Sequence, residues 1–370
     1  PGSIPIDSGR SQAFRSHDRG LTRMTHTHLV NSTRIAVLLS AVLLVVSGSA
    51  TAVAQAVSTV PIDEWTVPWP DTRPRDPFTD VAGGVWFVGQ TGDYMARLDP
   101  VTGSFARRDL PAGTGPHNLV VADDGSIWVA GNRTAELQVH DPTEGLTARI
   151  AMPDPAARDP HTLVFAEDGT LWFSVQNGNF VGRLKTASDP ARVELISVPT
   201  PSSRPYGIVL DDGGRPWFTE FAGGKIGTID PETLELREYE LPRPETRPRR
   251  LMLTSDGSVW YVDYAGGMLG RLDPTDGSVR EWSAPGGSEA RPYGMAVDEK
   301  DVLWFVETGP APNRLVGFDP ASEQFFSVTE IDSGGGSVRH MHYDVDRGDL
   351  WFGTDAGTIG RADLSAAEYP

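Results

Sequence analysis

Seven side chains that can bind ligands or exchange protons stand at one fixed place in a repeated unit of this sequence. Each lies eleven residues before a tryptophan, and six of the seven directly follow a proline. Histidine changes charge near neutral pH, and tyrosine and arginine donate hydrogen bonds to polar groups. Packing alone would rarely choose such residues at the start of a buried strand. The seven are Arg75, His117, His161, Tyr206, Arg249, Tyr293 and His340.

A second set of titratable side chains lies three residues after the same tryptophans, where three positions hold the carboxylates Glu220, Asp263 and Glu307. If the two sets stand on neighbouring antiparallel strands, both lie at the same end of the unit. Convergent titratable groups in a concavity are the default hypothesis for a binding or catalytic site. The alternative is a hydrated channel lined by mutually satisfied ion pairs, such as Asp263 with Arg249.

The tryptophans that define these positions recur with a period in the forties. Successive spacings are 42, 44, 45, 43, 44 and 47 residues along the series Trp86, Trp128, Trp172, Trp217, Trp260, Trp304 and Trp351. Each unit has four short strand patterns separated by Gly-containing and Asp-Pro turns, which is typical of propeller blades. We therefore predict an all-β, seven-bladed β-propeller with four-stranded blades. In such a ring the first strands of all blades begin around one mouth of the central channel.

The last unit has little room for a fourth strand after residues 359–361. The fourth-strand pattern appears instead near the other end of the chain, over residues 63–68. We predict that this N-terminal strand completes the seventh blade and closes the ring, because closure removes the open strand edges.

Residues 1–54 are predicted to stand outside the propeller. Residues 1–23 are polar and patternless, so we interpret them as an upstream or non-native segment. Met24 then begins a stretch with Arg34, an apolar run over 35–46 and small residues ending at Ala54, which is the pattern of a signal peptide. We predict a signal over 24–54, one domain over 55–370 and a secreted or extracytoplasmic protein. An uncleaved anchor or a buried helix is the alternative.

Composition excludes some kinds of site and some classes of binding partner. The chain has no cysteine, which excludes disulfides, thiolate metal sites and cysteine nucleophiles. Its net charge is −18, and residues 1–54 contain five arginines and two aspartates, so removing that +3 leaves about −21. Such a charge argues against nucleic acids and anionic membranes as partners. We expect a monomer.

The repeated pattern Pro-His/Tyr-Gly-Ile, Asp-Gly, Trp-Phe-Thr-Glu and Ile-Gly-x-Ile resembles the virginiamycin B lyase (streptogramin lyase) family over about residues 62–364. The resemblance implies a carbon–oxygen lyase of antibiotic resistance, which opens a cyclic depsipeptide at its ester by elimination and needs a divalent metal, usually magnesium. It also implies a small-molecule or cyclic peptide ligand. In that chemistry a histidine would remove a proton next to a carbonyl, and a metal on carboxylates would stabilise the enolate.

Carried over position by position, the resemblance places one residue of the family's site. His340 stands where the family has the histidine of a Glu-x-His at the start of the seventh blade. Tyr293, Val338 and Thr354 stand where the family has a histidine and two glutamates.

A version rotated around the ring is more complete. His117 follows a proline in the second unit, and Asp159 precedes His161 with one residue between them in the third. Because the blades are pseudo-symmetric, we hypothesise that the same constellation is built there. The alternative is that Pro-His is simply a habit of the repeat.

Three groups of site residues follow. The candidate catalytic bases are His340, His117 and His161. The candidate metal ligands are Glu220, Asp263, Glu307 and Asp159. The candidate substrate-binding residues are Tyr206, Tyr293, Arg75 and Arg249. The main alternative is a non-catalytic propeller that binds a ligand or a protein at the channel mouth. A third, a six-bladed-type lactonase that hydrolyses with calcium, is disfavoured by the count of seven units.

Overall fold

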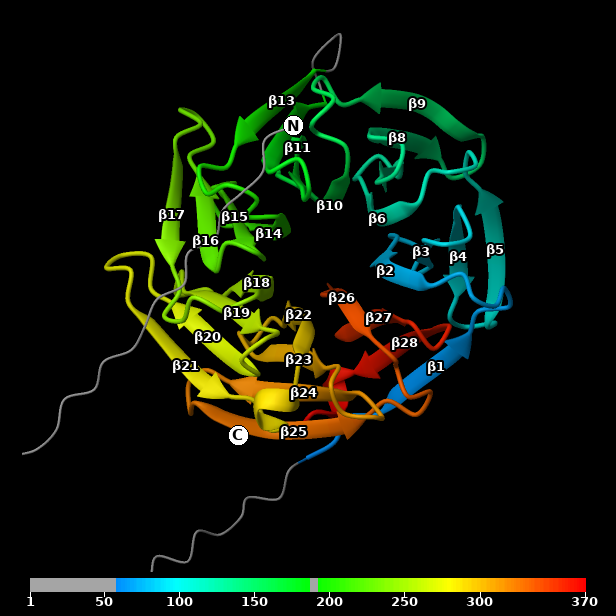
Figure 1. The fold of residues 1–370 in the computed structure, drawn as a ribbon. Helices are drawn as coiled ribbons and strands as arrows, with labels where there is room; N and C mark the ends of the chain where they lie inside the picture. The colour runs from blue at the N-terminus through cyan, green and yellow to red at the C-terminus, as the bar shows by residue number, and fades with distance from the viewer. Residues whose placement is uncertain (1–57, 187–191) are drawn as a thin grey trace, which may run out of the picture. The chain divides into compact units, whose positions relative to one another are not determined.

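The computed structural model describes residues 58–186 and 192–370, which form a ring of seven four-stranded antiparallel sheets (Figure 1). The prediction of an all-β, seven-bladed propeller is confirmed. In this part of the chain two short 3-10 turns, η1 (Gly287–Glu289) and η2 (Leu364–Ala366), are the helical elements, and no helix is long and apolar enough to cross a bilayer. The expected signal over 24–54 and the segment 1–23 lie outside the described residues.

Blades 1 to 6 each use four consecutive strands, and the first strand of each lies nearest the channel (Figure 1). Blade 1 contains β2 (Pro74–Thr79), β3 (Val85–Gly89), β4 (Tyr94–Asp99) and β5 (Ser104–Asp109). Blade 2 contains β6 (Pro116–Val121), β7 (Ile127–Gly131), β8 (Glu136–Asp141) and β9 (Gly145–Ala151). Blade 3 contains β10 (Pro160–Phe165), β11 (Thr170–Val175), β12 (Phe180–Lys185) and β13 (Val193–Ser197).

The next three blades repeat this order. Blade 4 contains β14 (Pro205–Leu210), β15 (Pro216–Glu220), β16 (Lys225–Ile229) and β17 (Leu236–Glu240). Blade 5 contains β18 (Pro248–Leu253), β19 (Val259–Asp263), β20 (Met268–Leu272) and β21 (Val279–Ser283). Blade 6 contains β22 (Pro292–Val297), β23 (Leu303–Glu307), β24 (Arg314–Asp319) and β25 (Gln324–Glu330).

Blade 7 is assembled from both ends of the propeller. It contains β26 (Val338–Asp344), β27 (Asp349–Thr354), β28 (Thr358–Asp363) and β1 (Ile62–Thr66). β1 pairs antiparallel with β28, with Ile62 opposite Ala362 and Thr66 opposite Thr358. The predicted closure by an N-terminal strand is therefore confirmed.

The repeated tryptophans fill the space between neighbouring blades. Trp304 of blade 6 is fully buried and packs with Val338, Leu350 and Phe352 of blade 7. Several indoles also fix the turn between the first two strands of their own blade; the indole N–H of Trp217, for example, donates to Asp211 at 3.1 Å. A large ring with one polar edge suits this place, because it packs on both sheets and still satisfies its donor.

Each of the seven inner strands carries a register irregularity near its start. In β14, Pro205 faces Glu220, but the regular pairing resumes only with Ile208 opposite Phe218. Proline suits the first position, because it has no N–H to offer the ladder. A bulge of this kind re-aims the side chains next to it. In five blades the two residues after the proline are thereby released from the sheet; the corresponding residues are Asp76 and Pro77 in blade 1, and Arg339 and His340 in blade 7. These residues lie at one mouth of the channel, which we call the strand-start mouth.

Candidate functional site

Four of the seven predicted ring residues form a continuous wall at the strand-start mouth. The ring centroids of His117 and His161 lie 3.4 Å apart, and those of His161 and Tyr206 lie 4.2 Å apart. The Tyr206 and Tyr293 hydroxyls share a hydrogen bond across the channel. All four side chains are at most 6% exposed. The structure therefore brings together residues that are separated by more than 170 positions in the sequence.

Arg249, the fifth ring residue, is held among aromatic rings. Its guanidinium carbon lies 3.9 Å from the ring centroid of Phe221 and 4.6 Å from those of Tyr264 and Tyr293. One of its terminal N–H groups also donates to the Tyr293 hydroxyl at 3.3 Å. Cation–π contacts of this kind stabilise an arginine that has no carboxylate beside it. Arg249 is thus positioned at the rim of the mouth, half-buried.

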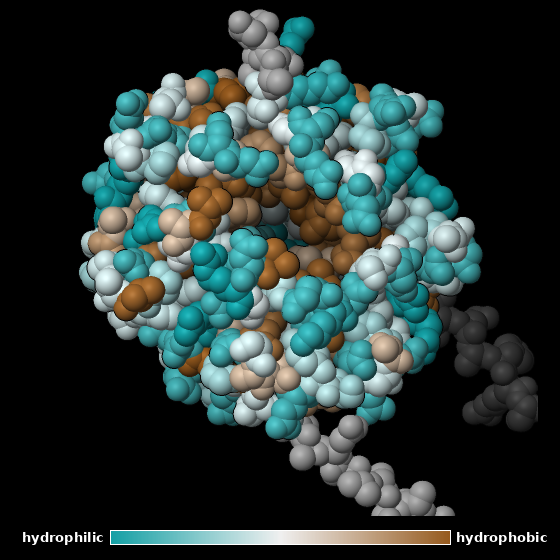
Figure 2. All heavy atoms as spheres, turned by 180° about the vertical axis from the view of Figure 1, so that it is seen from behind, coloured by the Kyte–Doolittle hydropathy of each residue, from teal (hydrophilic) through white to brown (hydrophobic). Residues whose placement is uncertain are grey.

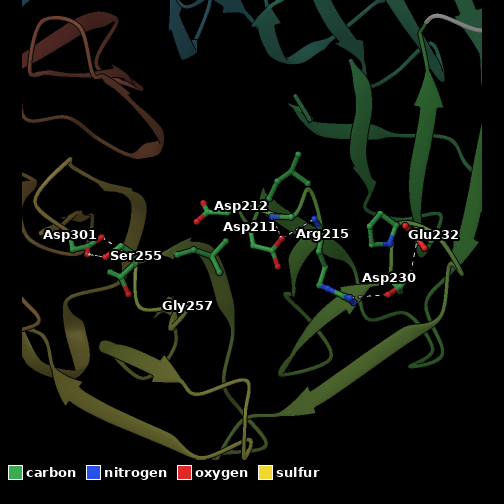
Figure 3. Close-up of a pocket in the computed structure, with 13 residues that line it drawn as sticks. Asp211, Asp212, Arg215, Asp230, Glu232, Ser255, Gly257 and Asp301 are labelled. Carbon is green, nitrogen blue, oxygen red and sulfur yellow. Dashed lines mark hydrogen bonds and ion pairs between the residues drawn. The ribbon is translucent and has the colours of Figure 1, made fainter. Parts of the chain in front are cut away.

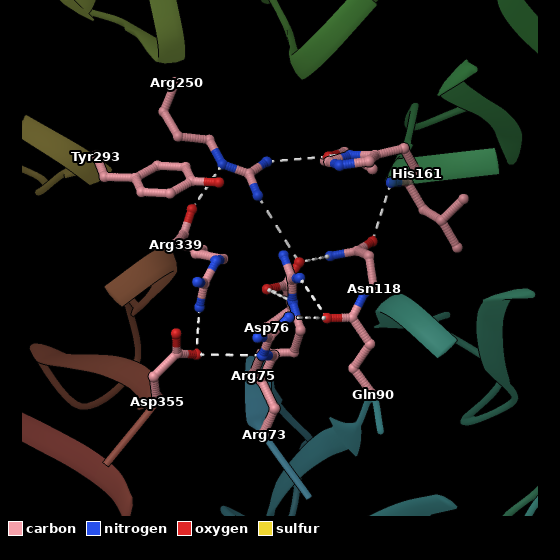
Figure 4. A network of polar contacts seen from close by, with 12 residues as sticks. Arg73, Arg75, Asp76, Gln90, Asn118, His161, Arg250, Tyr293, Arg339 and Asp355 are labelled. Carbon is pink, nitrogen blue, oxygen red and sulfur yellow. Dashed lines mark hydrogen bonds and ion pairs between the residues drawn. The ribbon is translucent and has the colours of Figure 1, made fainter. Parts of the chain in front are cut away.

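A buried polar network crosses the channel below this wall (Figure 4). Arg250 of blade 5 donates to Thr162 of blade 3 at 3.0 Å and to the backbone carbonyl of Arg339 in blade 7 at 2.9 Å. Asp76 of blade 1 accepts from Arg75 at 3.0 Å and from Asn118 of blade 2 at 3.1 Å. A terminal nitrogen of Arg250 lies 3.8 Å from the Asp76 carboxylate. Five blades therefore meet in one network.

Sequence reasoning missed the members of this network that directly follow the ring positions. Asp76, Thr162 and Arg250 stand ten residues before their tryptophans, one position after Arg75, His161 and Arg249. In a regular strand such neighbours point to opposite faces, but the bulge admits both to the channel. The available signal was a polar or charged residue at a place where three blades have Gly207, Gly294 and Met341; Asn118, which donates to Asp76, stands at the same place in blade 2.

Burial controls the charge of the histidines at the mouth. The pKa values of His117 and His161 are held well below the ordinary value, first by burial and then by nearby arginines, Arg75 for His117 and Arg250 for His161. Burial and Arg250 lower the pKa of His340 to about 3. These imidazoles are therefore neutral near pH 7 and able to accept a proton or a hydrogen bond.

The pKa values of the two hydrogen-bonded tyrosines, Tyr206 and Tyr293, are shifted in opposite directions. Burial would raise the pKa of Tyr206, but Arg250, Arg75 and Arg249 outweigh it and lower that pKa. Burial raises the pKa of Tyr293, and the neighbouring Tyr206 raises it further. The positive field of the arginines thus falls mainly on one phenol, which becomes the more acidic of the two.

Several buried polar atoms at the mouth have no hydrogen-bond partner among the described residues. They are the second terminal nitrogens of Arg75 and Arg250, Nε of Arg249, and Nδ1 of His117 and His340. Buried polar atoms are paired in the great majority of cases, so a cluster of unpaired ones needs an explanation.

The predicted metal-ligating carboxylates lie at the same end of the blades but are engaged in separate hairpins. Asp263 accepts from Arg243 at 2.6 Å and from the backbone N–H of Arg247 at 2.8 Å, and so it is not paired with Arg249. Glu307 accepts from the side chain of Arg314 and from the backbone N–H of Gly286.

The other two predicted ligands are also separate. Asp159 accepts the N–H groups of Asn177 and Gly178 and so caps the β11–β12 turn. Glu220 is fully buried, and neither of its oxygens has a hydrogen-bond partner in the described part of the chain. Burial, followed by the neighbouring Glu238, raises the pKa of Glu220 to about 8.

The described residues do not fit a divalent metal at the mouth. Within residues 58–186 and 192–370, no three His, Asp or Glu side chains are grouped as a metal ion requires. In blade 7, where the family resemblance calls for two glutamates, Val338 and Thr354 face each other in register and are buried. The nearest carboxylate, Asp76, is already paired with arginines. A hard cation needs several free oxygen ligands, and the mouth instead presents guanidinium groups.

The opposite face of the ring is built differently. A pocket of about 650 Å³ lies there between blades 4 and 5, and many of its lining residues are acidic (Figure 3). Asp211 accepts the N–H groups of Gly213 and Arg215 at 3.0 Å, and Arg215 donates to Asp230 at 2.8 Å. These carboxylates serve as caps of their own turns.

The inner strands also end in apolar residues on that opposite face. The partly exposed positions are Val121, Phe165, Leu210, Leu253 and Val297. Viewed from the side opposite to Figure 1, the hollow at the centre of the ring is lined largely by hydrophobic residues (Figure 2). Polar groups that converge across blades are therefore a property of the strand-start mouth.

Comparisons with known proteins agree with this architecture. The model of the virginiamycin B lyase family matches residues 131–365. A comparison with curated proteins finds no match.

Several solved structures resemble the chain over most of its length. Virginiamycin B lyase from Staphylococcus aureus is 22% identical, with 82% of this chain and 99% of that chain covered. Its TM-score is 0.73, or 0.72 as a catalytically inactive histidine-to-alanine variant with quinupristin. A streptogramin B lyase is 25% identical, with 82% and 97% covered and a TM-score of 0.71. YCF48 bound to a peptide is 12% identical, with 85% and 100% covered and a TM-score of 0.66.

Proposed function

The chain belongs to the virginiamycin B lyase family, and from that premise we propose that it recognises a small or peptide-like ligand at the strand-start mouth. One observation carries the proposal: side chains from five blades converge there and leave buried donors unpaired within the described residues. Two similar propellers support the ligand class, since one is described with quinupristin and another with a peptide. We place the protein outside the cytoplasm on the strength of the leader-like segment 24–54.

A second candidate function is the opening of an ester by elimination, and the close approach of the His117 and His161 imidazoles, 3.4 Å between ring centroids, favours it. The unpaired Nδ1 of His117 would take the proton from the carbon next to a carbonyl. The electron pair left on that carbon would form a C=C bond with the adjacent carbon, whose alkyl C–O bond to the ester would break, and the carboxylate would leave with the electrons of that bond. N–H groups of Arg75 and Arg250 would stabilise the negative charge on the carbonyl oxygen. Magnesium, expected from the family, would supply Lewis-acid stabilisation at that oxygen, but the residues of this mouth do not provide its ligands.

The test uses the full chain and a streptogramin B depsipeptide, with magnesium or with a chelator. Binding is measured by calorimetry and any product by mass spectrometry. We expect saturable binding that the chelator leaves unchanged and that Arg249→Gln weakens at least tenfold. Equal binding by the variant and the wild type would place the ligand elsewhere.

The product decides between the two candidate functions. A linear product isomeric with the substrate would establish elimination, and its loss with chelator would establish the metal that the family resemblance predicts. A product heavier by one water would mean hydrolysis. Binding without any product would identify a recognition protein.

A further inference from the structure

We propose that the strand-start mouth selects ligands that carry carboxylates, as in an acidic peptide, and binds them through arginine N–H groups that have no hydrogen-bond partner among the described residues. The inference rests on the proposed function for the location of the ligand, and it adds the chemical class. Its basis is the arrangement of guanidinium groups around the mouth, from the buried network outward to the rim.

The innermost anchors are Arg75 and Arg250. They are 3% and 2% exposed, and each keeps one terminal nitrogen without a hydrogen-bond partner among the described residues (Figure 4). Their shared counterion is Asp76, which also accepts from Asn118. A buried N–H group without an acceptor costs free energy, and more so when it belongs to a charged group. A ligand carboxylate at this point would accept both orphaned donors.

The balance of charge at the mouth also favours an anion. Five guanidinium groups, those of Arg73, Arg75, Arg249, Arg250 and Arg339, stand at the mouth, and their acidic neighbours are Asp76 and Asp355. Five positive and two negative charges leave +3 at this place, in a chain whose net charge is −18. Repulsion by the rest of the protein is screened beyond about 8 Å at physiological ionic strength, so the local arginines dominate for a ligand in contact.

A pocket of about 660 Å³ at the rim provides a second anchor beside the mouth. Its lining includes Arg133, Arg158 and Arg204 together with Asn132 and Asn177. The three arginine side chains are exposed and make no ion pair with any residue of 58–186 or 192–370.

The pocket adjoins the mouth along the chain, because Arg204 lies two residues before Tyr206 and Asp159 two before His161. Asp159, the one carboxylate of the pocket, is occupied by the N–H groups of Asn177 and Gly178. The guanidinium groups of the pocket are therefore free to bind a ligand.

The chemistry of these groups points to oxyanions. A guanidinium presents a planar fork of donors that matches a carboxylate or a phosphate, with two parallel hydrogen bonds. An inner and an outer arginine cluster would suit a ligand with separated negative charges along a flexible backbone, which an acidic peptide provides. Phosphate shares the geometry and is therefore an arm of the test.

The experiment measures binding of two matched peptides to the full chain by calorimetry. The probes are acetylated tetraglutamate and acetylated tetraglutamine, and inorganic phosphate is the third ligand. We expect tetraglutamate to bind at least tenfold more tightly than tetraglutamine, and more weakly as sodium chloride rises from 50 to 300 mM. Equal affinity for the two peptides would overturn the inference, and tighter binding of phosphate than of tetraglutamate would replace the carboxylate class.

Variants locate the site. A triple variant, Arg133→Gln with Arg158→Gln and Arg204→Gln, changes exposed side chains and should keep the fold while it lowers tetraglutamate affinity at least tenfold. Arg75→Gln tests the inner anchor, and Arg215→Gln, on the opposite face, is the matched control that should bind as the wild type does. Equal loss in the control would mean general electrostatics and would overturn the site. Depsipeptide binding that Arg249→Gln abolishes, without discrimination between the peptides, would defeat this inference and leave the proposed function standing.

Discussion

The two ends of the channel are made by the same seven inner strands, yet they satisfy their polar groups in different ways. On the opposite face, carboxylates such as Asp211 and Asp230 accept N–H groups of their own turns. At the strand-start mouth, Asp76 and Arg250 depend on residues of other blades. Hydrogen bonds within one turn can form as soon as a single blade folds. Hydrogen bonds and ion pairs between blades can form only when the ring is complete. The second arrangement is the one that leaves donors for a ligand.

The largest expected difference between the two ends is in stability. Asp76→Ala would leave the buried guanidinium groups of Arg75 and Arg250 without their counterion, and we expect a loss of about 3–5 kcal/mol in the free energy of unfolding. Asp230→Ala, its counterpart on the exposed opposite face, should cost far less. Urea unfolding of both variants measures the two values, and equal losses would contradict the distinction between the two ends.

Acid should weaken the strand-start mouth. The pKa of His340 is lowered to about 3 in the folded protein, so below pH 6.5 the unfolded chain binds a proton that the folded chain does not. Stability therefore falls as pH decreases, by up to about 1.4 kcal/mol per pH unit for this histidine. Urea midpoints at pH 7 and pH 5 should differ less in His340→Gln than in the wild type. An unchanged difference would show that His340 accepts its proton while folded.

An effect of similar size and opposite sign is expected from Glu220. Its pKa is raised to about 8 when folded, so between pH 4.5 and 8 the folded protein holds a proton that the unfolded chain has lost. Stability therefore decreases as pH rises through that window, and Glu220→Gln should remove about 2 kcal/mol of the decrease between pH 5.5 and 7.5. Thermal unfolding at the two pH values makes the comparison, and parallel pH dependence of wild type and variant would refute it.

The smallest effect is expected on the opposite face. Arg215→Gln removes a partly exposed ion pair with Asp230, and such pairs contribute about 0–1 kcal/mol. We expect an unfolding free energy within 1 kcal/mol of the wild type and unchanged ligand binding. A larger loss, measured by urea unfolding, would mean that this face holds cross-blade networks of its own.

The fold was predictable from the sequence because every blade repeats the same physical solution. A tryptophan between sheets and a turn after the inner strand recur seven times, and a proline at the start of the inner strand recurs six times, so chance agreement is small. Blade 7 lacked a fourth strand near the end of the repeats, and residues 63–68 had a fourth-strand pattern with no blade of their own. Pairing the two was therefore the simplest way to complete the ring. The pairing of β1 with β28 was predictable although the two strands lie far apart in the sequence. The sequence of each strand matches the pattern of its position in a blade.

The site was only partly predictable. The positions of His117, His161 and Tyr206 followed from their count before each tryptophan, but the admission of Arg250 did not, since it depends on the bulge. The carboxylates at Asp263 and Glu307 lie at the expected ends of their strands. Their side chains face the hairpin turns, and the sequence pattern does not encode which neighbour a strand-end side chain meets.

The pairing of β1 with β28 gives the order of synthesis a role in folding. Among the strands, the first to be made meets the last, almost three hundred residues later, so the ring cannot close while the ribosome is still adding β28. Until that moment the nascent chain is an open arc with two bare edges, and Arg250, Asp76 and Arg339 have not all met. Synthesis of β28 and assembly of the ligand mouth are then one event, and a molecule truncated before β28 is expected to lose both ring closure and the mouth.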